Sequence, residues 1–574
     1  MPSHSHRSLP CPVLICAVVI GLLSIAARTA QTQGQPSVRK VPAPQLKNLV
    51  EKLGGGASLV LARQLGLTEI AGKRIGGGSP GNAQAKKLKD VAIGADPVQE
   101  EDEPSVAANP KSKKYLVAGS QSFPSANFET GCVAYSSSDS GATWSAPYPM
   151  PQLESYSFCS DPVIVYAPNG SRVYYTYMDI KSVDDLTNWP ASYTANVDWD
   201  VVVSYSDDNG ATWVGPVVAL DGDPYEMTFT PCPQPWEYCG TVSEPGFVFD
   251  KPWIGTHVDP GQSAWVYVTA TEFPVTAEPA ESAISFTGSS NKGASWSAPF
   301  TVASGGQDWR VQGSRPVGGL GGEVLVAWYD QGDDGWLGGG FEIRTRRSYN
   351  HGAVGSWDDI VVAATDSYEL QYFLGPYFFP DPFGGFYKRW WCAMFPDVEV
   401  DLQGRAHIVY THDPDPSFDT AEDGDIRYIA SPGPPYGAGS WSTPMTVNDD
   451  GMVRAQGYAA LKVQHGSDGE ALVHVIWEDS RLSPDVPIEF PNSPNLYYDI
   501  FYARKPGTYP FFSRNMRVSE ASSIQGFFTG DYNDLAANDR LLFAIWTDRR
   551  DKSDIMDFEN DVYGSRIIPG GAAP

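Results

Sequence analysis

The chain has 574 residues, more than one small core requires, and 57 of them are glycine and 47 proline, while aromatic residues make up 12%. This composition is typical of many short strands joined by tight turns rather than of helices. The formal net charge of −28 argues against nucleic acid as a partner, because a phosphate-binding surface has to be basic. The charge also weighs against an anionic polymer, and its simplest interpretation is an acidic surface that keeps an exported protein soluble.

The N-terminal segment is typical of export. An apolar run from Val13 to Ala27 is followed by small residues up to Ala30. The run is shorter than the apolar segment that a membrane-spanning helix usually needs. We therefore expect residues 1–30 to be a signal peptide that is removed, no membrane span, and a secreted protein, either extracellular or periplasmic. Arg28 leaves the cleavage position open. Residues 31–89, which are rich in lysine and contain two Gly-Gly-Gly runs, are predicted to be a flexible basic leader.

A loose repeat begins at about residue 90. Each unit has a polar loop, an apolar strand, a second strand rich in Val, Tyr and Trp, and then two further strands. The seven second strands are predicted at 115–118, 173–177, 265–268, 324–328, 407–410, 473–477 and 542–546. One four-stranded antiparallel unit cannot bury both of its faces, so the units must close into a ring. We predict an all-β fold, a single β-propeller over residues 90–567, with seven four-stranded blades and six as the alternative.

The last unit indicates how the ring closes. After Asp561–Arg566 the chain has no fourth strand, whereas Asp90–Gly94 is a spare strand at the start. We expect this N-terminal strand to complete the last blade and residues 568–574 to form a C-terminal tail. Units six and seven also share a W-x-D-x-R pattern at 477–481 and 546–550, which we interpret as an internal salt bridge repeated by duplication.

Three copies of one turn motif, S-x-D/N-x-G-x-T/S-W, occupy residues 137–144, 206–213 and 289–296. The short side chains of Asp139, Asp208 and Asn291 are suited to accept hydrogen bonds from backbone N–H groups, and the glycine is suited to a positive φ. The motif resembles the Asp box, or BNR repeat, of sialidases and related β-propellers. The resemblance implies a sialidase-like propeller, although sialidases have six blades, and it implies little about a reaction because the box is a structural turn.

The loops that lead into the innermost strands of a propeller converge on its axis at one face. From these loops we select seven candidate catalytic residues: Glu103, Asp161, Arg315, Asp397, Tyr458, Asp531 and Tyr532. Charge crowded around an axis perturbs pKa values and binds ligands. The alternative for each residue is structural, because an X-Pro pair sets the angle at which a strand begins and an acid satisfies backbone amides.

Candidate substrate-binding residues come from the same loops and from one long aromatic loop between Tyr368 and Trp391. A loop this long and aromatic is unusual unless it binds a ligand or covers the core. We select Lys251, Arg389, Trp390 and Trp391, because cations and aromatic faces suit a sugar. Packing over a blade edge is the alternative for the aromatic residues.

The resemblance to sialidases implies three arginines that clamp a carboxylate, a tyrosine activated by a glutamate, and an aspartate as acid and base. The first arginine normally lies in an Arg-Ile-Pro motif at the start of the first blade, where this chain has Asp102-Glu103-Pro104. An acid at that place would repel a carboxylate. Arg315 alone is expected at a comparable ring position, and Tyr458 and Tyr532 are the two candidates for a phenolate nucleophile.

Five cysteines follow the signal peptide: Cys132, Cys159, Cys232, Cys239 and Cys392. Export permits disulfides, and we expect Cys232 to pair with Cys239 across a proline-rich loop and Cys132 with Cys159 between neighbouring strands. Cys392 is then left as a thiol. None of the spacings is that of a metal site such as CxxC, so we predict no metal and no cofactor, with calcium left open.

Three functions follow as hypotheses. The first is a secreted sialidase-like propeller that engages glycans or a glycan-bearing surface, with a glycoside hydrolase of non-sialidase specificity as its enzymatic form. The second is a non-catalytic scaffold that presents its acidic face to another protein. The third is a lyase acting on uronate polymers, for which His257, His407 or His412 would be candidate bases and a bridging calcium ion would offset the acidic ring. We expect a monomer, and whether the protein is an enzyme stays open.

Overall fold

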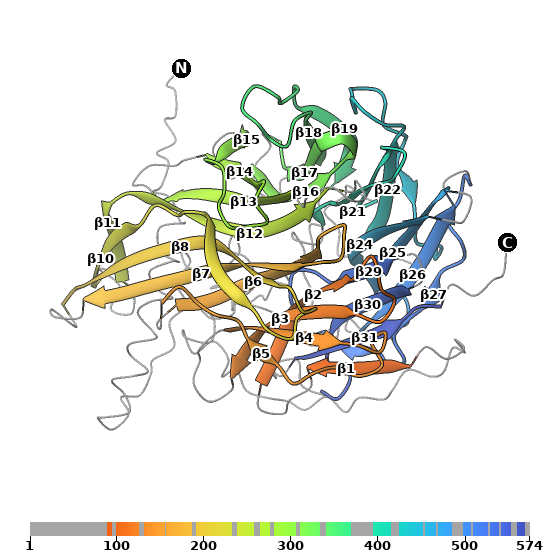
Figure 1. The fold of residues 1–574 in the computed structure, drawn as a ribbon, viewed down its shortest axis with the longest axis horizontal. Coiled ribbons are helices and arrows are strands. Elements are labelled where there is room, and N and C mark those ends of the chain that lie inside the picture. The colour runs from red at the N-terminus through yellow and green to blue at the C-terminus, as the bar shows by residue number, and fades with distance from the viewer. Residues whose placement is uncertain are drawn as a thin grey trace, which may run out of the picture.

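The computed structural model of the chain describes residues 89–94, 99–124, 131–154, 157–185, 191–231, 238–257, 265–275, 281–305, 310–332, 340–368, 394–414, 424–451, 454–465, 469–484, 497–506, 509–525, 529–538, 541–552 and 560–568. Over these residues the fold is all-β, with seven antiparallel sheets in a ring (Figure 1). The prediction of a propeller with seven blades, rather than six, is therefore confirmed. The signal peptide, all but one residue of the leader, Arg389, Trp390, Trp391, Cys232 and Cys392 lie outside the described residues.

The first four blades follow the chain in order, each from its innermost strand outward. Blade 1 consists of β2 (Gln99–Ala108), β3 (Leu116–Pro124), β4 (Gly131–Ser137) and β5 (Tyr148–Pro149). Blade 2 consists of β6 (Ser157–Tyr166), β7 (Val173–Asp185), β8 (Tyr193–Ser206) and β9 (Val214–Leu220), and β10 (Tyr225–Pro231) and β11 (Tyr238–Glu244) widen it beyond β8. Blade 3 consists of β12 (Gly246–Thr256), β13 (Val266–Val275), β14 (Ser282–Ser289) and β15 (Phe300–Gly305). Blade 4 consists of β16 (Val311–Gly318), β17 (Val324–Asp330), β18 (Gly340–Ser348) and β19 (Val361–Tyr368), with a 3-10 turn, η2 (Leu320–Gly322), between its first two strands.

The remaining blades include the one that closes the ring. Blade 5 consists of β20 (Asp397–Val400), β21 (Ala406–His412), β22 (Asp425–Ser431) and β23 (Met445–Thr446). Blade 6 consists of β24 (Gln456–His465), β25 (Ala471–Asp479), β26 (Tyr497–Pro506) and β27 (Met516–Arg517), with β28 (Ser523–Ile524) also paired to β26. Blade 7 consists of β29 (Asp534–Asn538), β30 (Leu541–Asp548), β31 (Asp561–Arg566) and, from the other end of the chain, β1 (Asp90–Gly94). All seven predicted second strands occupy the second position of a blade.

The N-terminal strand closes the ring as predicted. β1 lies beside β31 in antiparallel register, with Asp90 opposite Ser565 and Ala92 opposite Tyr563 (Figure 1). Arg550 also places its guanidinium 2.7 Å from the Asp90 carboxylate. Closure therefore combines a backbone ladder with an ion pair.

Within the described ranges, no helix has the length and apolarity that a bilayer span requires.

Among the residues that the structure describes, the hydrophobic core consists of seven clusters, one between each pair of neighbouring blades. Successive side chains of a strand point to opposite faces of its sheet, so each strand serves two clusters. In β7, for example, Tyr175 packs against blade 1 and Tyr174 against blade 3. This is why the second strands are apolar at nearly every position rather than at alternate ones.

Side chains near the axis also join neighbouring innermost strands. The backbone N–H groups of three innermost strands donate to side-chain oxygens of the blade before them: Val106 to Asp534 at 2.9 Å, Ile164 to Ser105 at 3.0 Å and Leu461 to Asp397 at 2.7 Å. These bonds fix the strands relative to one another where the axial loops begin.

The three turn motifs share one hydrogen-bond pattern. In the first, the Gly141 N–H donates to the Ser137 hydroxyl at 2.9 Å and the Thr143 N–H donates to the Asp139 carboxylate at 2.9 Å. The same bonds recur around Asp208 and Asn291. The turns join the third and fourth strands of blades 1, 2 and 3, at the outside of the ring.

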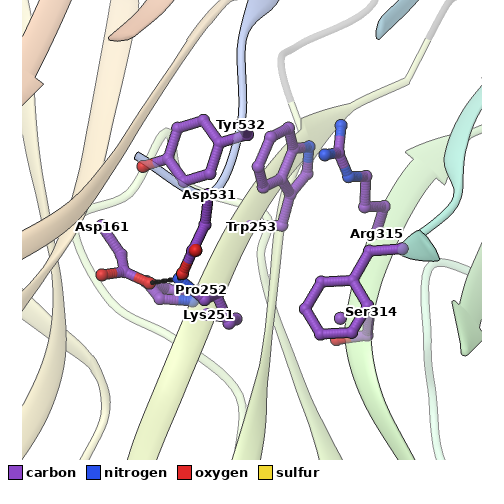
Figure 2. Close-up of a pocket in the computed structure, with 10 residues that line it drawn as sticks. Asp161, Lys251, Pro252, Trp253, Ser314, Arg315, Asp531 and Tyr532 are labelled. Carbon is purple, nitrogen blue, oxygen red and sulfur yellow. Dashed lines mark hydrogen bonds and ion pairs between the residues drawn. The ribbon is translucent and has the colours of Figure 1, made fainter. Parts of the chain in front are cut away.

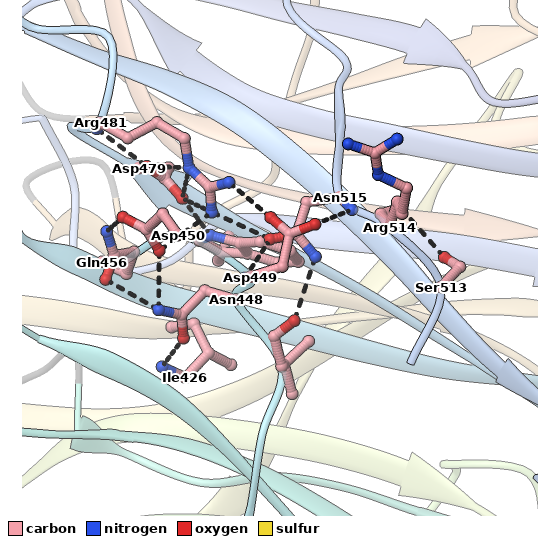
Figure 3. A network of polar contacts seen from close by, with 12 residues as sticks. Ile426, Asn448, Asp449, Asp450, Gln456, Asp479, Arg481, Ser513, Arg514 and Asn515 are labelled. Atoms are coloured by element: carbon pink, nitrogen blue, oxygen red, sulfur yellow. Dashed lines mark hydrogen bonds and ion pairs between the residues drawn. The ribbon is translucent and has the colours of Figure 1, made fainter. Parts of the chain in front are cut away.

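The salt bridge predicted for the W-x-D-x-R pattern is present in both blades. The Trp477 indole N–H donates to Asp479 at 2.7 Å, and Arg481 pairs with the same carboxylate at 2.7 Å. Trp546, Asp548 and Arg550 repeat the arrangement in blade 7. Arg481 also reaches Asp449 at 2.8 Å, so this network connects blade 6 with the segment that follows β23 of blade 5 (Figure 3).

One of the two expected disulfides lies within the described residues. Cys132 of β4 and Cys159 of β6 form a disulfide with a Cα–Cα distance of 5.5 Å, which joins blade 1 to blade 2. The pairing of Cys232 with Cys239 stays a prediction.

Candidate functional site

A β-bulge occupies the same place in the innermost strands of blades 1, 2, 3, 4 and 6. The first bulge residue has a positive φ in each case: Glu103 at 50°, Asp161 at 54°, Lys251 at 52°, Gly313 at 63° and Tyr458 at 54°. A non-glycine residue in this region is strained by about 1–3 kcal/mol and is often found at functional sites. Bulges also re-aim side chains, and in blades 1, 2 and 3 the first bulge residues, Glu103, Asp161 and Lys251, meet one another.

The bulges correct one alignment made from the sequence. We expected Arg315-Pro316 to be the counterpart of Glu103-Pro104 and Asp161-Pro162. In the strand pairing, Gly313-Ser314 is that counterpart. Arg315 comes directly after the bulge, the position that Trp253 holds in blade 3. Proline at 316 was a misleading signal, because Pro104, Pro162 and Pro252 lie within the bulge whereas Pro316 follows it.

Three carboxylates surround one lysine at the centre of the site. The Lys251 ammonium lies 2.9 Å from Asp161 and 2.5 Å from Asp531 (Figure 2). It also lies 3.5 Å from Glu103. The four residues come from blades 1, 2 and 3 and from the loop that leads into β29 of blade 7. All four are buried, with Glu103 at 0% exposure. The sequence prediction that these residues meet at the axis agrees with this geometry.

Glu103 is the most deeply buried of the three carboxylates. Its carboxyl accepts a hydrogen bond from Gln121 and another, at 3.2 Å, from the Asp531 backbone N–H. Burial, and next the negative charge of Asp161, raise the pKa of Glu103 well above its ordinary value, while the Lys251 ammonium opposes the shift. We therefore expect Glu103 to hold a proton at pH values where an exposed glutamate is ionised.

A small pocket opens beside this cluster, lined by Asp161, Lys251, Pro252, Trp253, Gly313, Ser314, Arg315, Phe395, Asp531 and Tyr532. Trp253 lies between Tyr532 and Arg315 (Figure 2). The Arg315 guanidinium stacks 3.5 Å from the centre of the Trp253 ring, and the Trp253 and Tyr532 rings meet edge to face at 5.5 Å. Arg315 also pairs with Asp397 at 2.9 Å. The pocket thus has an acidic end at Lys251 and a basic end at Arg315, with aromatic side chains between them.

Tyr532 is held in its neutral form. Its hydroxyl donates to the Pro162 carbonyl at 3.0 Å. Burial, and next the negative charge of Glu103, raise the pKa of the phenol well above its ordinary value. A phenol in this state is a hydrogen-bond donor rather than a phenolate nucleophile.

The remaining candidates selected from the sequence, within the part of the chain that the structure describes, do not line the pocket. Asp397 does not line the pocket but contacts Arg315. Tyr458 is 6% exposed and packs in the core cluster between blades 4 and 5. The three candidate bases for a lyase also lie outside the lining: His407 contacts the Tyr428 hydroxyl at 2.7 Å, His412 accepts from Arg427 at 2.6 Å, and His257 is buried.

Sequence reasoning missed Trp253, Gly313, Ser314 and Phe395, which line the pocket. A signal was present for two of them. A glycine at 313, two residues before an axial arginine, marks the bulge in blade 4, and it makes Ser314 the neighbour of that bulge. No group of three or more histidine, cysteine, aspartate or glutamate side chains suited to a metal ion occurs among the residues that the structure describes.

No protein-family model matches the chain, and no curated protein sequence matches it. Among solved structures, the chain is similar to the Hadza microbial sialidase Hz136, at 13% identity over 79% of this chain and 76% of that chain, with a TM-score of 0.38. It is similar to the α-L-arabinofuranosidase arb93a from Fusarium graminearum, at 14% identity over 72% and 98% of the two chains, with a TM-score of 0.35. It is also similar to the intramolecular trans-sialidase from Ruminococcus gnavus, at 12% identity over 81% and 94%, with a TM-score of 0.37. At these identities and TM-scores the likenesses carry no argument about activity, and the fold rests on the seven sheets of the chain itself.

Proposed function

We propose that the axial pocket is a glycan site and that the protein is a glycoside hydrolase whose working carboxylates are Asp161 and Asp531. The observation that carries this proposal is that two carboxylates, from blade 2 and from the loop before blade 7, line one pocket together with aromatic side chains. Hydrolysis of a glycosidic bond needs one carboxyl group that protonates the leaving oxygen and a second that attacks the sugar or activates water.

The spacing of the two carboxylates favours the retaining class. Both contact the same Lys251 nitrogen, at 2.9 and 2.5 Å, so their contacting oxygens lie no further apart than those two distances added together. Retaining enzymes hold their carboxyl groups about 5–5.5 Å apart, and inverting enzymes about 6.5–9.5 Å apart. In this proposal one carboxylate is the nucleophile, the other is the acid and then the base, and Lys251 holds both in place.

A sialidase-type centre is not supported. Arg315 is the one arginine among the residues that line the described pocket, and it is already paired with Asp397. Burial and the negative charge of Glu103 keep the Tyr532 phenol neutral by raising its pKa, and its hydroxyl donates to the Pro162 carbonyl, which does not suit a nucleophile. The proposal is therefore a glycosidase with a carboxylate pair, rather than a tyrosine with an arginine clamp.

The proposal includes export. The disulfide between Cys132 and Cys159 supports an oxidising compartment, in agreement with the signal peptide expected at residues 1–30. The glycan, or a glycan-bearing surface, would then be met outside the cytosol.

The test is hydrolysis of a panel of aryl glycosides by the purified full-length protein. Asp161→Asn and Asp531→Asn should each lower kcat about 100-fold or more, since acid–base catalysis contributes about that much. Asp207→Asn serves as the matched control, because Asp207 is exposed and pairs with Arg172 at the outside of blade 2. The control should retain full activity. Absence of turnover and of glycan binding across the panel would contradict the proposal.

One observation favours the scaffold as a second candidate. Lys251 already contacts all three carboxylates, so the cluster is also able to act as a purely structural brace across the axis. On that interpretation, pull-downs return a specific protein partner and the two Asp→Asn variants change stability without any change in a catalytic rate.

A further inference from the structure

The disulfide between Cys132 and Cys159 joins the two blades that contribute Glu103 and Asp161 to the axial cluster. Cys132 belongs to β4, the third strand of blade 1, and Cys159 belongs to β6, the innermost strand of blade 2. Both cysteines are buried, at 2% and 1% exposure. The bridge is therefore a covalent bond between two neighbouring blades, made among buried side chains rather than at the surface.

On the side of blade 2, the bridge is two residues away from Asp161. Cys159 is followed by Ser160, whose hydroxyl donates to the Asp161 carboxylate at 2.6 Å. Asp161 is the first residue of the bulge and lies outside the regular pairing of β6 with β7. Because a bulge interrupts the ladder of backbone hydrogen bonds, the sheet holds Asp161 less firmly than the residues on either side. An anchor two residues away therefore bears directly on the position of the carboxylate.

On the side of blade 1, one residue connects the bridge with Glu103. Cys132 of β4 lies opposite Gln121 of β3, and opposite residues of an antiparallel pair are about 4.5–5.5 Å apart. The Gln121 amide donates to the Glu103 carboxyl, and the Gln121 side chain is buried. Glu103 is also a bulge residue, with a φ of 50°. The same bridge thus lies next to the hydrogen-bond donors of both carboxyl groups.

The two carboxyl groups meet at one cation. The Lys251 ammonium lies 2.9 Å from Asp161 and 3.5 Å from Glu103. The lysine attracts both groups, whereas the carboxyl groups repel one another when both are ionised. A covalent bond between blades 1 and 2 opposes this repulsion and keeps the distance between the groups fixed.

We propose that Cys132 and Cys159 are positioning residues. Their disulfide holds Asp161 in place beside Lys251, and the axial cluster reaches its working geometry only when the bridge is formed. Neither cysteine lines the described pocket, so both act through the residues that adjoin them. The statement about geometry stands on the contacts of the cluster, whereas its consequence for catalysis rests on the proposed function.

Hydrogen exchange at Asp531 tests the geometry without any need for activity. The Asp531 backbone N–H donates to the Glu103 carboxyl at 3.2 Å, so its exchange reports whether the cluster is intact. Mass spectrometry compares the full-length wild-type protein with the double variant Cys132→Ala, Cys159→Ala, at a temperature where both are folded. The peptide that contains Asp531 should exchange about 10-fold faster in the double variant, because local opening governs exchange.

The second measurement is the rate on an aryl glycoside that the wild-type protein hydrolyses. A misplacement of about 1 Å is able to cost about 100-fold in rate, so the double variant should lose about 10- to 100-fold in kcat. Its KM should change much less, because a displaced Asp161 weakens the stabilisation of the transition state more than the binding of the substrate.

Gly141→Ala is the matched control. Gly141 lies in the turn that follows β4 of blade 1 and has a φ of 83°, and a Cβ there would overlap the Phe543 ring. The variant therefore destabilises the same blade, but at the outside of the ring. It should lower the Tm, as the double variant does, and leave both the exchange of the Asp531 peptide and kcat unchanged.

Two results would overturn the inference. Exchange and kcat that stay at wild-type values in the double variant mean that the bridge only stabilises the fold. Equal changes in the double variant and in Gly141→Ala mean that lost stability in blade 1, rather than the missing bridge, disturbs the cluster. Faster exchange in the double variant alone, with no turnover by the wild-type protein, supports the positioning role and contradicts the glycoside hydrolase.

Discussion

The ammonium of Lys251 lies 2.5 Å from the carboxylate of Asp531, a residue 280 positions further along the chain. The contact joins blade 3 to the loop that leads into blade 7, two blades that are not neighbours in the ring. Asp161 and Glu103, from the two blades between them, contact the same ammonium. One cation thus connects four consecutive blades at the axis, including blade 7, whose outermost strand β1 closes the ring.

Replacement of Lys251 by methionine should lower the free energy of unfolding by about 3–5 kcal/mol, the usual cost of leaving a buried charge without its partner. Removal of the ammonium also removes the charge that opposes the raised pKa of Glu103, so this pKa rises further. A raised folded-state pKa means stability that is present at low pH and lost as pH rises. The deficit should therefore be larger at pH 8 than at pH 5 in urea unfolding curves. Lys181→Met is the control, because Lys181 pairs with Glu154 while 36% exposed; equal deficits for the two variants would contradict the argument.

The glycines of two turn motifs offer a matched pair of substitutions. Gly141 and Gly293 have φ values of 83° and 82°, so alanine is strained equally at both. A Cβ on Gly141 would overlap the Phe543 ring, whereas the atom nearest to a Cβ on Gly293 lies 3.4 Å away, in Tyr174. We expect Gly293→Ala to cost about 1 kcal/mol and Gly141→Ala about 1–3 kcal/mol more. Thermal unfolding measures both, and similar losses would show that packing against blade 7 is not what requires the glycine.

The fold could be predicted from the sequence because the patterns that indicate it are local and repeated. The second strands are apolar at successive positions, as in Val324–Trp328, since each blade buries both faces. The turn motif marks one end of the outer hairpin in three blades. Closure by Asp90–Gly94 followed from a count of strands, which needs no knowledge of side-chain contacts.

Only part of the site could be predicted from the sequence, because the site depends on the register of the innermost strands. Glu103, Asp161 and Lys251 each precede a proline, and this pattern marks the bulge in three blades. In blade 4 the bulge is marked by Gly313 instead, so Arg315 was aligned two residues out of place. Phe395 reaches the pocket through packing against Gly313, a contact between two blades that no local pattern encodes.

The disulfide should stabilise the contact between blades 1 and 2. Cys132 and Cys159 are both almost completely buried, so alanine is a suitable replacement for each. The double variant Cys132→Ala, Cys159→Ala should lose about 2–4 kcal/mol of unfolding free energy, the usual contribution of a disulfide that closes a loop of this size. Unfolding in urea with and without a thiol reductant provides the check. The reductant should destabilise the wild-type protein more than the double variant, and any sensitivity that the variant keeps would report the predicted bridge between Cys232 and Cys239. Equal sensitivity of the two proteins would contradict the contribution of the Cys132–Cys159 disulfide.

Asp200 should make the stability of blade 2 depend on pH. Its carboxyl is 8% exposed and accepts from the Gly222 N–H at 2.9 Å. Burial, and next in importance the opposing bond from Gly222 and the nearby charge of Asp198, leave its pKa raised to about 7. Because the pKa is higher in the folded state, the protonated form contributes stability that is present below about pH 4 and lost as pH rises through about 7.

Asp200→Asn removes this titration and keeps the acceptor for Gly222. The variant should therefore exceed the unfolding free energy of the wild-type protein by more at pH 8 than at pH 5, with a gain of about 1–4 kcal/mol at pH 8, at about 1.4 kcal/mol for each unit of pKa shift. Urea unfolding at the two pH values measures the difference. Asp221→Asn, at an exposed neighbour, should give a smaller gain, because it removes one repelling charge and no buried one. A gain for Asp200→Asn that is the same at both pH values would contradict this prediction. It would mean that burial does not destabilise the ionised form of Asp200.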